Sequence, residues 1–172
     1  AAGYSLVENV LLKYLSEKVF EGISRYIITD ADVYITIVGA TVGKAGIIPP
    51  CLSGANLTEN ACRLVLNAEI EKRFVYFFTQ TNSFKEQVWI NTRVAAQPKL
   101  ALRRLKSILI PFPQLEEQRD VVRRCDQLRG NTKEIESIFQ QKLSDLDELK
   151  QSILQKAFTG RLTSKSTELQ SI

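Results

Sequence analysis

Histidine is absent from this sequence, and so is methionine. Without histidine the chain lacks the commonest general base, the usual partner of a nucleophilic serine or cysteine, and the ligand of most zinc sites. Carboxylates are plentiful, but most of them lie beyond residue 114, and the spacing of Asp30 and Asp32 is typical of a turn. The sequence therefore predicts no catalytic site, no metal site and no cofactor bound by this chain.

Cysteine is scarce, and its three positions, Cys51, Cys62 and Cys125, show no C-x-x-C spacing. An odd number of such residues suggests neither a zinc site nor a disulfide framework, and buried reduced thiols are the expected state. The chain also lacks a run of about 18 apolar residues, so it predicts no membrane span. Residues 1–12 lack the features of a signal peptide. We expect a cytoplasmic protein.

What the chain does contain is enough apolar sequence for a packed core. It has 172 residues, 44% of them hydrophobic, and a formal net charge of +4. The length fits one domain with an extension. The mild positive charge is compatible with nucleic acid, but it is also common in proteins that never bind it.

Residues 1–113 mix short helix and strand patterns, which predicts an α+β domain. The expected elements are a helix at 15–21 with Ser16 as N-cap, strands at 33–38, 46–48, 63–66 and 105–110, and a helical stretch at 69–88. The aromatic residues of that stretch, continued by Trp89, are expected to pack in the core. Gly39 and Gly43 punctuate the turn of a hairpin between the first two strands. Pro111 and Pro113 stop the last strand, and we place a domain boundary there.

Beyond Gln114 the sequence becomes charged and amphipathic. A seam recurs in alternating steps of three and four residues, with polar residues at Thr132 and Lys142. Its predicted dimerisation residues are Cys125, Leu128, Ile135, Phe139, Leu146, Leu149 and Ile153. We expect a nearly continuous helix over 115–157, about 65 Å long, with a soft spot at Gly130. Such a helix needs a second long helix to bury its stripe, and this chain supplies none.

The segment 39–45 resembles a phosphate-binding loop only superficially. Three residues separate Gly39 from Gly43, whereas the nucleotide-binding pattern needs four, and Ala45 stands where that pattern has serine or threonine. The better interpretation is a turn that presents Thr41 and Lys44 to DNA phosphates or base edges. The alternative is a plain hairpin with a solvated lysine.

A second donor-rich segment lies at 91–100 and carries Arg93, Gln97 and Lys99. Its small residues and two cations suit a DNA-contacting loop, but they suit an ordinary loop equally well. Arg103, Arg104 and Lys106 follow and extend the positive patch. We expect Thr41, Lys44, Arg93, Gln97 and Lys99 to share one DNA-facing side of the domain.

Four segments together resemble the specificity subunits of type I restriction-modification enzymes. They are the G-x-T-x-G-K hairpin at 39–44, A-Q-P-K-L at 96–100, the run I-L-I-P-F-P-Q-L-E-E-Q at 108–118, and Q-S-I-L-Q-K-A-F-T-G-R-L at 151–162. Each motif is weak alone, whereas their order and spacing are specific. The resemblance covers about residues 15–162.

The resemblance implies a target recognition domain followed by a spacer helix that forms an antiparallel coiled coil. In this family each recognition domain reads one half of a bipartite site in double-stranded DNA. The helices dock methyltransferase subunits, which use S-adenosylmethionine, and a restriction subunit joins for ATP- and Mg-dependent cleavage. We therefore expect a recognition domain at 1–113, incomplete at its N-terminus, a spacer and dimerisation helix at 114–162, and a flexible tail at 163–172.

Three alternative functions are compared for this chain. The first is a DNA specificity subunit, or half of one, that forms a homodimer through its helix. The second is an assembly module that dimerises or binds methyltransferase but no longer reads DNA. The third, a nucleotide-using enzyme, is disfavoured by the missing histidine and the wrong glycine spacing.

Overall fold

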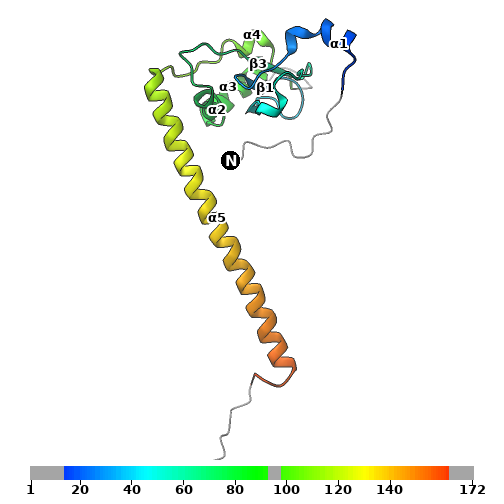
Figure 1. Cartoon of the computed structure of the whole chain (residues 1–172). Coiled ribbons are helices and arrows are strands. Elements are labelled where there is room, and N and C mark those ends of the chain that lie inside the picture. Colours follow the sequence, from blue (N-terminus) through cyan, green and yellow to red (C-terminus); the bar gives the residue numbers. More distant parts are fainter. Residues whose placement is uncertain (1–13, 93–97, 163–172) are drawn as a thin grey trace, which may run out of the picture. The chain divides into compact units, whose positions relative to one another are not determined.

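The computed structural model describes residues 14–92 and 98–162 (Figure 1). The chain divides into two compact units, with the boundary after Asp126. The first unit contains all the short elements and the beginning of the last helix. In chain order the elements are α1 (Glu17–Gly22), the 3₁₀ turn η1 (Ser24–Tyr26), β1 (Val33–Thr36), β2 (Ala45–Ile47), the 3₁₀ turn η2 (Pro50–Leu52), β3 (Ala61–Leu64), α2 (Lys72–Thr79), α3 (Asn82–Thr92), α4 (Leu102–Leu105) and α5 (Leu115–Phe158).

The sheet of the first unit has three antiparallel strands in the order β2-β1-β3. Tyr34 in the central strand lies opposite Gly46 of β2 and Arg63 of β3. The predicted hairpin and the third strand are thus confirmed. Val33 and Ile35 are almost fully buried, and they alternate with the half-buried Tyr34 and Thr36, as expected for a strand with one face on the core.

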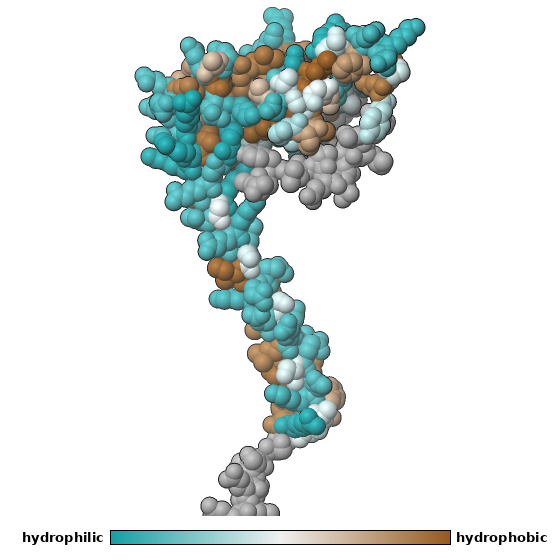
Figure 2. Space-filling model, in the orientation of Figure 1, coloured by the Kyte–Doolittle hydropathy of each residue, from teal (hydrophilic) through white to brown (hydrophobic). Residues whose placement is uncertain are grey.

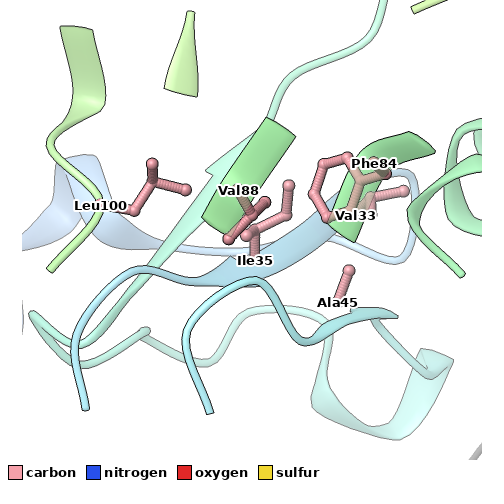
Figure 3. Packing of buried hydrophobic residues seen from close by; sticks show 6 residues of the cluster. All are labelled: Val33, Ile35, Ala45, Phe84, Val88 and Leu100. Carbon is pink, nitrogen blue, oxygen red and sulfur yellow. The ribbon is translucent and has the colours of Figure 1, made fainter. Parts of the chain in front are cut away.

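The core lies between the sheet and α3. Figure 3 shows six of its buried residues, drawn from β1, β2, α3 and the segment just before α4: Val33, Ile35, Ala45, Phe84, Val88 and Leu100. Phe84 and Val88 are one helical turn apart, so one stripe of α3 covers the sheet. Packing therefore places α3 directly beside the hairpin that connects β1 and β2.

The helical stretch predicted at 69–88 is two helices, because residues 80–81 interrupt it between α2 and α3. Its aromatic residues are also not uniformly in the core. Phe74 and Phe84 are buried, whereas Trp89 is 63% exposed. The short helix predicted near the N-terminus is present, but the Ser16 side chain makes no capping hydrogen bond.

The strand predicted at 105–110 is wrong. Residues 102–105 form the short helix α4, and the following residues pair with no strand in the described part of the chain. Instead, the Leu109 N–H donates to Oε1 of Gln87, and Nε2 of Gln87 donates to the Leu109 carbonyl. The β-type composition was misread because local apolar runs do not reveal which partner satisfies the backbone.

The long helix is confirmed as α5, which continues through Gly130 without interruption. Residues 163–172, predicted as a flexible tail, lie outside the described residues, and the domain limits remain predictions. In the part of the chain that the structure describes, no helix is both long and apolar enough to span a bilayer.

Candidate nucleic-acid interface

The turn between β1 and β2 is built around two glycines in the left-handed region, Gly39 at φ +100° and Gly43 at φ +86°. Gly43 N–H donates to the Thr36 carbonyl, and Thr36 N–H donates to the Lys44 carbonyl, both at 2.8 Å. A Cβ atom on Gly43 would lie 2.9 Å from a methyl group of Val88. The glycine spacing that resembles a phosphate loop thus serves a tight turn against α3.

Thr41 and Lys44 are both exposed on this turn. They border a hollow of about 300 Å³ whose other wall comes from the end of α2 and from α3. Gln80 and Lys85 line that wall. The hollow thus combines two ammonium groups, a hydroxyl and a carboxamide, which are the donors that proteins use toward phosphate oxygens and base edges.

The second predicted loop joins the first through its backbone. Gly39 N–H donates to the Pro98 carbonyl at 3.1 Å, Val38 and Lys99 form an isolated antiparallel bridge, and Leu100 N–H donates to the Ile37 carbonyl at 2.8 Å. Leu100 is fully buried and anchors the segment in the core, while Lys99 is exposed. These bonds bring the Lys99 segment beside the Thr41–Lys44 turn.

Two predicted site residues, Arg93 and Gln97, lie outside the described residues. Their part in a DNA-facing surface remains a prediction, as does the role of the three residues that are described.

Two residues of α3 were not singled out from the sequence as site residues, although they adjoin the turn. Lys85 and Trp89, one helical turn apart, line a second hollow of about 440 Å³ together with Gly39, Ala40 and Pro98. Trp89 was assigned to the core with the other aromatic residues. Its exposure could have been suspected, because Phe84 and Val88 already define the buried stripe of α3 and Trp89 is turned away from Val88 by about 100°.

Further positive charge comes from α4. Arg103 and Lys106 are exposed, and Arg104 donates from its guanidinium to the Asn91 carbonyl at 2.7 Å. This bond ties α4 to the last turn of α3. Part of the basic cluster is therefore used to hold the fold together, and the exposed side chains remain to attract an anion.

Of the two carboxylates at the start of the sheet, Asp32 holds a turn together. Asp32 is 4% exposed and accepts from Thr29 N–H at 2.8 Å, from the Thr29 hydroxyl at 3.1 Å and from Arg63 at 3.5 Å. These donors satisfy the buried charge and close a turn. Across the described residues, no group of three or more acidic residues, histidines or cysteines could hold a metal ion.

The cysteines are free thiols, but the expectation that they are buried is wrong for Cys51, which is exposed, and only partly right for Cys62 and Cys125, which are half-buried. Cys51 follows Pro50 in the turn η2 at the surface, where no packing is available to it. Burial raises the pKa of the Cys62 thiol, against the weaker opposing effect of nearby backbone hydrogen bonds. Cys62 is therefore a poor nucleophile.

The predicted dimerisation residues lie along α5, where large apolar side chains remain exposed: Leu128, Ile135, Phe139, Leu146, Leu149 and Ile153. Cys125 is half-buried. Figure 2 shows hydrophobic patches at intervals along this otherwise hydrophilic helix. Ile138 and Leu143 flank Phe139 and are also exposed, which broadens the seam beyond the predicted positions. Association through this seam remains a prediction.

Comparison with known proteins places these features in a family. The family model for the type I restriction modification DNA specificity domain matches residues 4–145. Two similar curated proteins from Escherichia coli are the type I restriction enzyme EcoBI specificity subunit, 30% identical over 90% of this chain, and the EcoDI specificity subunit, 34% identical over 58%. The chain spans 32% of the first relative's length and 22% of the second's.

Solved structures show the same fold. The HsdS subunit from Thermoanaerobacter tengcongensis superposes with a TM-score of 0.64 at 22% identity, over 74% of this chain and 33% of that one. A chain from a study of complex assembly and conformational transition of the type I R-M system gives a TM-score of 0.63 at 22% identity, over 76% and 34%. The small antiparallel sheet followed by a long C-terminal helix is therefore the architecture of that fold. By its matched residues and its fold, the chain belongs to the type I restriction-modification DNA specificity family.

Proposed function

We propose that this chain reads one half of a bipartite site in double-stranded DNA and contributes the spacer helix of a specificity subunit. The observation that carries the proposal is the backbone junction between Gly39 and Pro98, which sets the Lys99 segment beside the Thr41–Lys44 turn. Two loops far apart in sequence thus offer donors side by side. Lys85 of α3 adds a third cation next to the turn.

Under this proposed function the chain itself catalyses no reaction. Its recognition surface holds DNA, while methyltransferase subunits that use S-adenosylmethionine, and restriction subunits that use ATP and Mg, perform the reactions. Docking of both kinds of subunit on α5 belongs to the same proposal. Purified alone, the chain should neither methylate nor cleave DNA, and transfer of a labelled methyl group by the isolated chain would contradict it.

A second candidate function is an assembly module that keeps the helix interactions without reading DNA. The exposed apolar seam of α5 favours association equally under both functions, so it does not separate them. The cations beside the turn favour the DNA-reading function, since an assembly module has no need of them at that place.

DNA binding by the full chain at several salt concentrations separates the two functions. A specificity subunit should lose affinity steeply as salt increases, because each phosphate contact releases a counterion. It should also prefer some sequences in a random pool, by a factor of about 10³ or more over non-specific DNA. The measurement is repeated with the methyltransferase subunit added. If the complex then binds DNA only weakly and without sequence preference, the assembly module is favoured.

A further inference from the structure

The beginning of α5 is held to the recognition domain by one buried glutamine. Gln118 has no exposed surface. Its Oε1 accepts from Glu71 N–H at 2.9 Å, and its Nε2 donates to the Glu69 carbonyl at 3.1 Å and to the Pro113 carbonyl at 2.9 Å. Both amide hydrogens and one lone pair are thus satisfied, which removes the usual cost of burying a polar group.

Two further residues extend this contact along the same face of the helix. Gln118, Val122 and Asp126 are spaced four residues apart and form one stripe. Val122 is 6% exposed, and Asp126 forms an ion pair with Arg73. Glu71 is the N-cap of α2 and Arg73 lies in its first turn, so the stripe attaches the first three turns of α5 to the start of α2.

The stripe precedes the exposed apolar seam along the helix. Gln118 lies seven residues before the seam position Cys125, a rotation of only about 20°, so the two residues share a face at the beginning of α5. Gln118 and Val122 are buried, whereas the seam residues from Leu128 onward are exposed. Gln118 can therefore be changed without altering a residue of the exposed seam.

We propose that Gln118 is a positioning residue that fixes the spacer helix to the recognition domain and thereby sets the number of base pairs between the two half-sites. This inference rests on the proposed function. The part of α5 from Asp126 to Phe158 is about 48 Å long at 1.5 Å per residue. A change of about 5° in the direction of this part at Asp126 would displace Phe158 by about 4 Å. One base-pair step is about 3.4 Å. Single-base-pair accuracy therefore requires a rigid attachment.

The attachment needs a carboxamide and not merely a side chain of this size. In Gln118→Glu the two donated hydrogen bonds are lost, and a carboxylate faces the carbonyl oxygens of Glu69 and Pro113. In Gln118→Ala all three hydrogen bonds are lost and a cavity remains. Gln127→Glu makes the same chemical change at an exposed position of α5 and is the matched control.

The test uses the full chain with its methyltransferase subunit. Wild-type protein first selects its site from a random DNA pool, and binding is then measured to the selected half-sites separated by longer and shorter spacers. Wild type and Gln127→Glu should prefer one spacer length by about tenfold or more, the effect typical of a mismatched site. Gln118→Glu and Gln118→Ala should reduce that preference to about threefold or less while binding of a single half-site stays within about twofold.

If either Gln118 variant folds and keeps the wild-type spacer preference, the inference is wrong while the proposed function stands. If wild type itself selects no sequence, the proposed function fails, and the inference fails with it. Should both Gln118 variants fail to fold, Asp126→Asn removes only the ion pair with Arg73 and should broaden the preference in the same direction to a smaller extent. An unchanged preference in Asp126→Asn would then overturn the proposal.

Discussion

The side-chain carboxamide of Gln87 pairs with both main-chain groups of Leu109, accepting from its N–H at 2.8 Å and donating to its carbonyl at 3.0 Å. A single side chain on α3 thus takes the place that a neighbouring strand would occupy. This pairing brings the segment after α4 against α3 and lets the chain proceed toward Pro111 and α5 without a fourth strand.

Replacing Gln87 with Ala should loosen that segment. Two hydrogen bonds near the surface are lost, and each contributes about 0.5–1.5 kcal/mol net, so the free energy of unfolding should fall by about 1–2 kcal/mol. Urea denaturation followed by circular dichroism measures the change. Glu86→Ala, at an exposed neighbour on α3, is the control and should change stability by less than about 0.5 kcal/mol.

The same pairing explains what the sequence could and could not predict. β-branched and apolar composition between turn residues predicted β1, β2 and β3, although β3 begins two residues earlier than expected, and the alternating spacing of three and four residues predicted α5. The segment at 105–110 has the apolar content of a strand, but its partner is a glutamine distant in sequence, and no local pattern encodes that. Trp89 was missed because aromatic content was taken for burial, although the helical phase of α3 turns it outward.

The sequence predicted the turn of the candidate site but not the long-range contacts around it. The glycines at 39 and 43 and the exposed Thr41 and Lys44 followed from the motif alone. A shared side for Lys99 and the turn was expected from the donor-rich composition of both loops, but the backbone junction itself depends on long-range hydrogen bonds that no local pattern encodes. The burial of Gln118 could not be predicted from the sequence, where this residue was only one member of a signature.

Two glycine substitutions should change stability in opposite directions. Gly43→Ala places a Cβ atom 2.9 Å from Val88 in a backbone with φ +86°, and should cost about 1–3 kcal/mol. Gly130→Ala adds a Cβ with no heavy atom within 4 Å in the middle of α5, and should stabilise that helix by about 1 kcal/mol. Thermal denaturation of both variants checks the signs, and stabilisation by Gly43→Ala would contradict the close approach of the turn to α3.

The cysteines should differ in reactivity. The thiolate is the reactive form, and burial raises the pKa of Cys62, which reduces its thiolate content, while Cys51 is exposed to a reagent in solution. With iodoacetamide at about pH 8, Cys51 should be modified first and Cys62 at least about tenfold more slowly. Peptide mass spectrometry over time measures both rates. Denaturant should make the rates similar, and a difference that persists after unfolding would not be due to burial.

Removing a cation beside the turn should weaken DNA binding in a way that salt reveals. Lys44→Ala and Lys99→Ala should each lower the slope of log affinity against log salt by about 0.9, which is the contribution of one phosphate contact. Fluorescence anisotropy at several salt concentrations gives the slope. Lys150→Ala, at an exposed position on α5, should leave it unchanged. A wild-type slope in both turn variants would remove these lysines from the DNA-facing surface.

Phe139→Asp should separate two copies of the chain that associate through antiparallel α5 helices. Phe139 is 62% exposed, and Ile135 and Leu146 continue the same exposed seam, so a second copy can bury them all. In an antiparallel pair with two-fold symmetry, a residue near the middle of the helix lies close to its own symmetry mate. Such a pair also sets the two recognition domains at opposite ends of the spacer, and two identical domains related by a dyad would read an inverted repeat.

The substitution removes an apolar side chain from each copy and places two carboxylates near one another. Burial of a phenylalanine contributes about 1.5–3 kcal/mol, so two copies lose about 4 kcal/mol, or roughly a thousandfold in the dissociation constant. Light scattering at micromolar concentration should give a dimer for wild type and a monomer for Phe139→Asp. Ser144→Asp adds the same charge at an exposed position about 140° around the helix from Phe139, and should remain a dimer. A wild-type monomer would show that the seam does not join two copies. An unchanged dimer in Phe139→Asp would show the same, because a carboxylate buried at the interface beside its symmetry mate should dissociate a dimer that uses this seam.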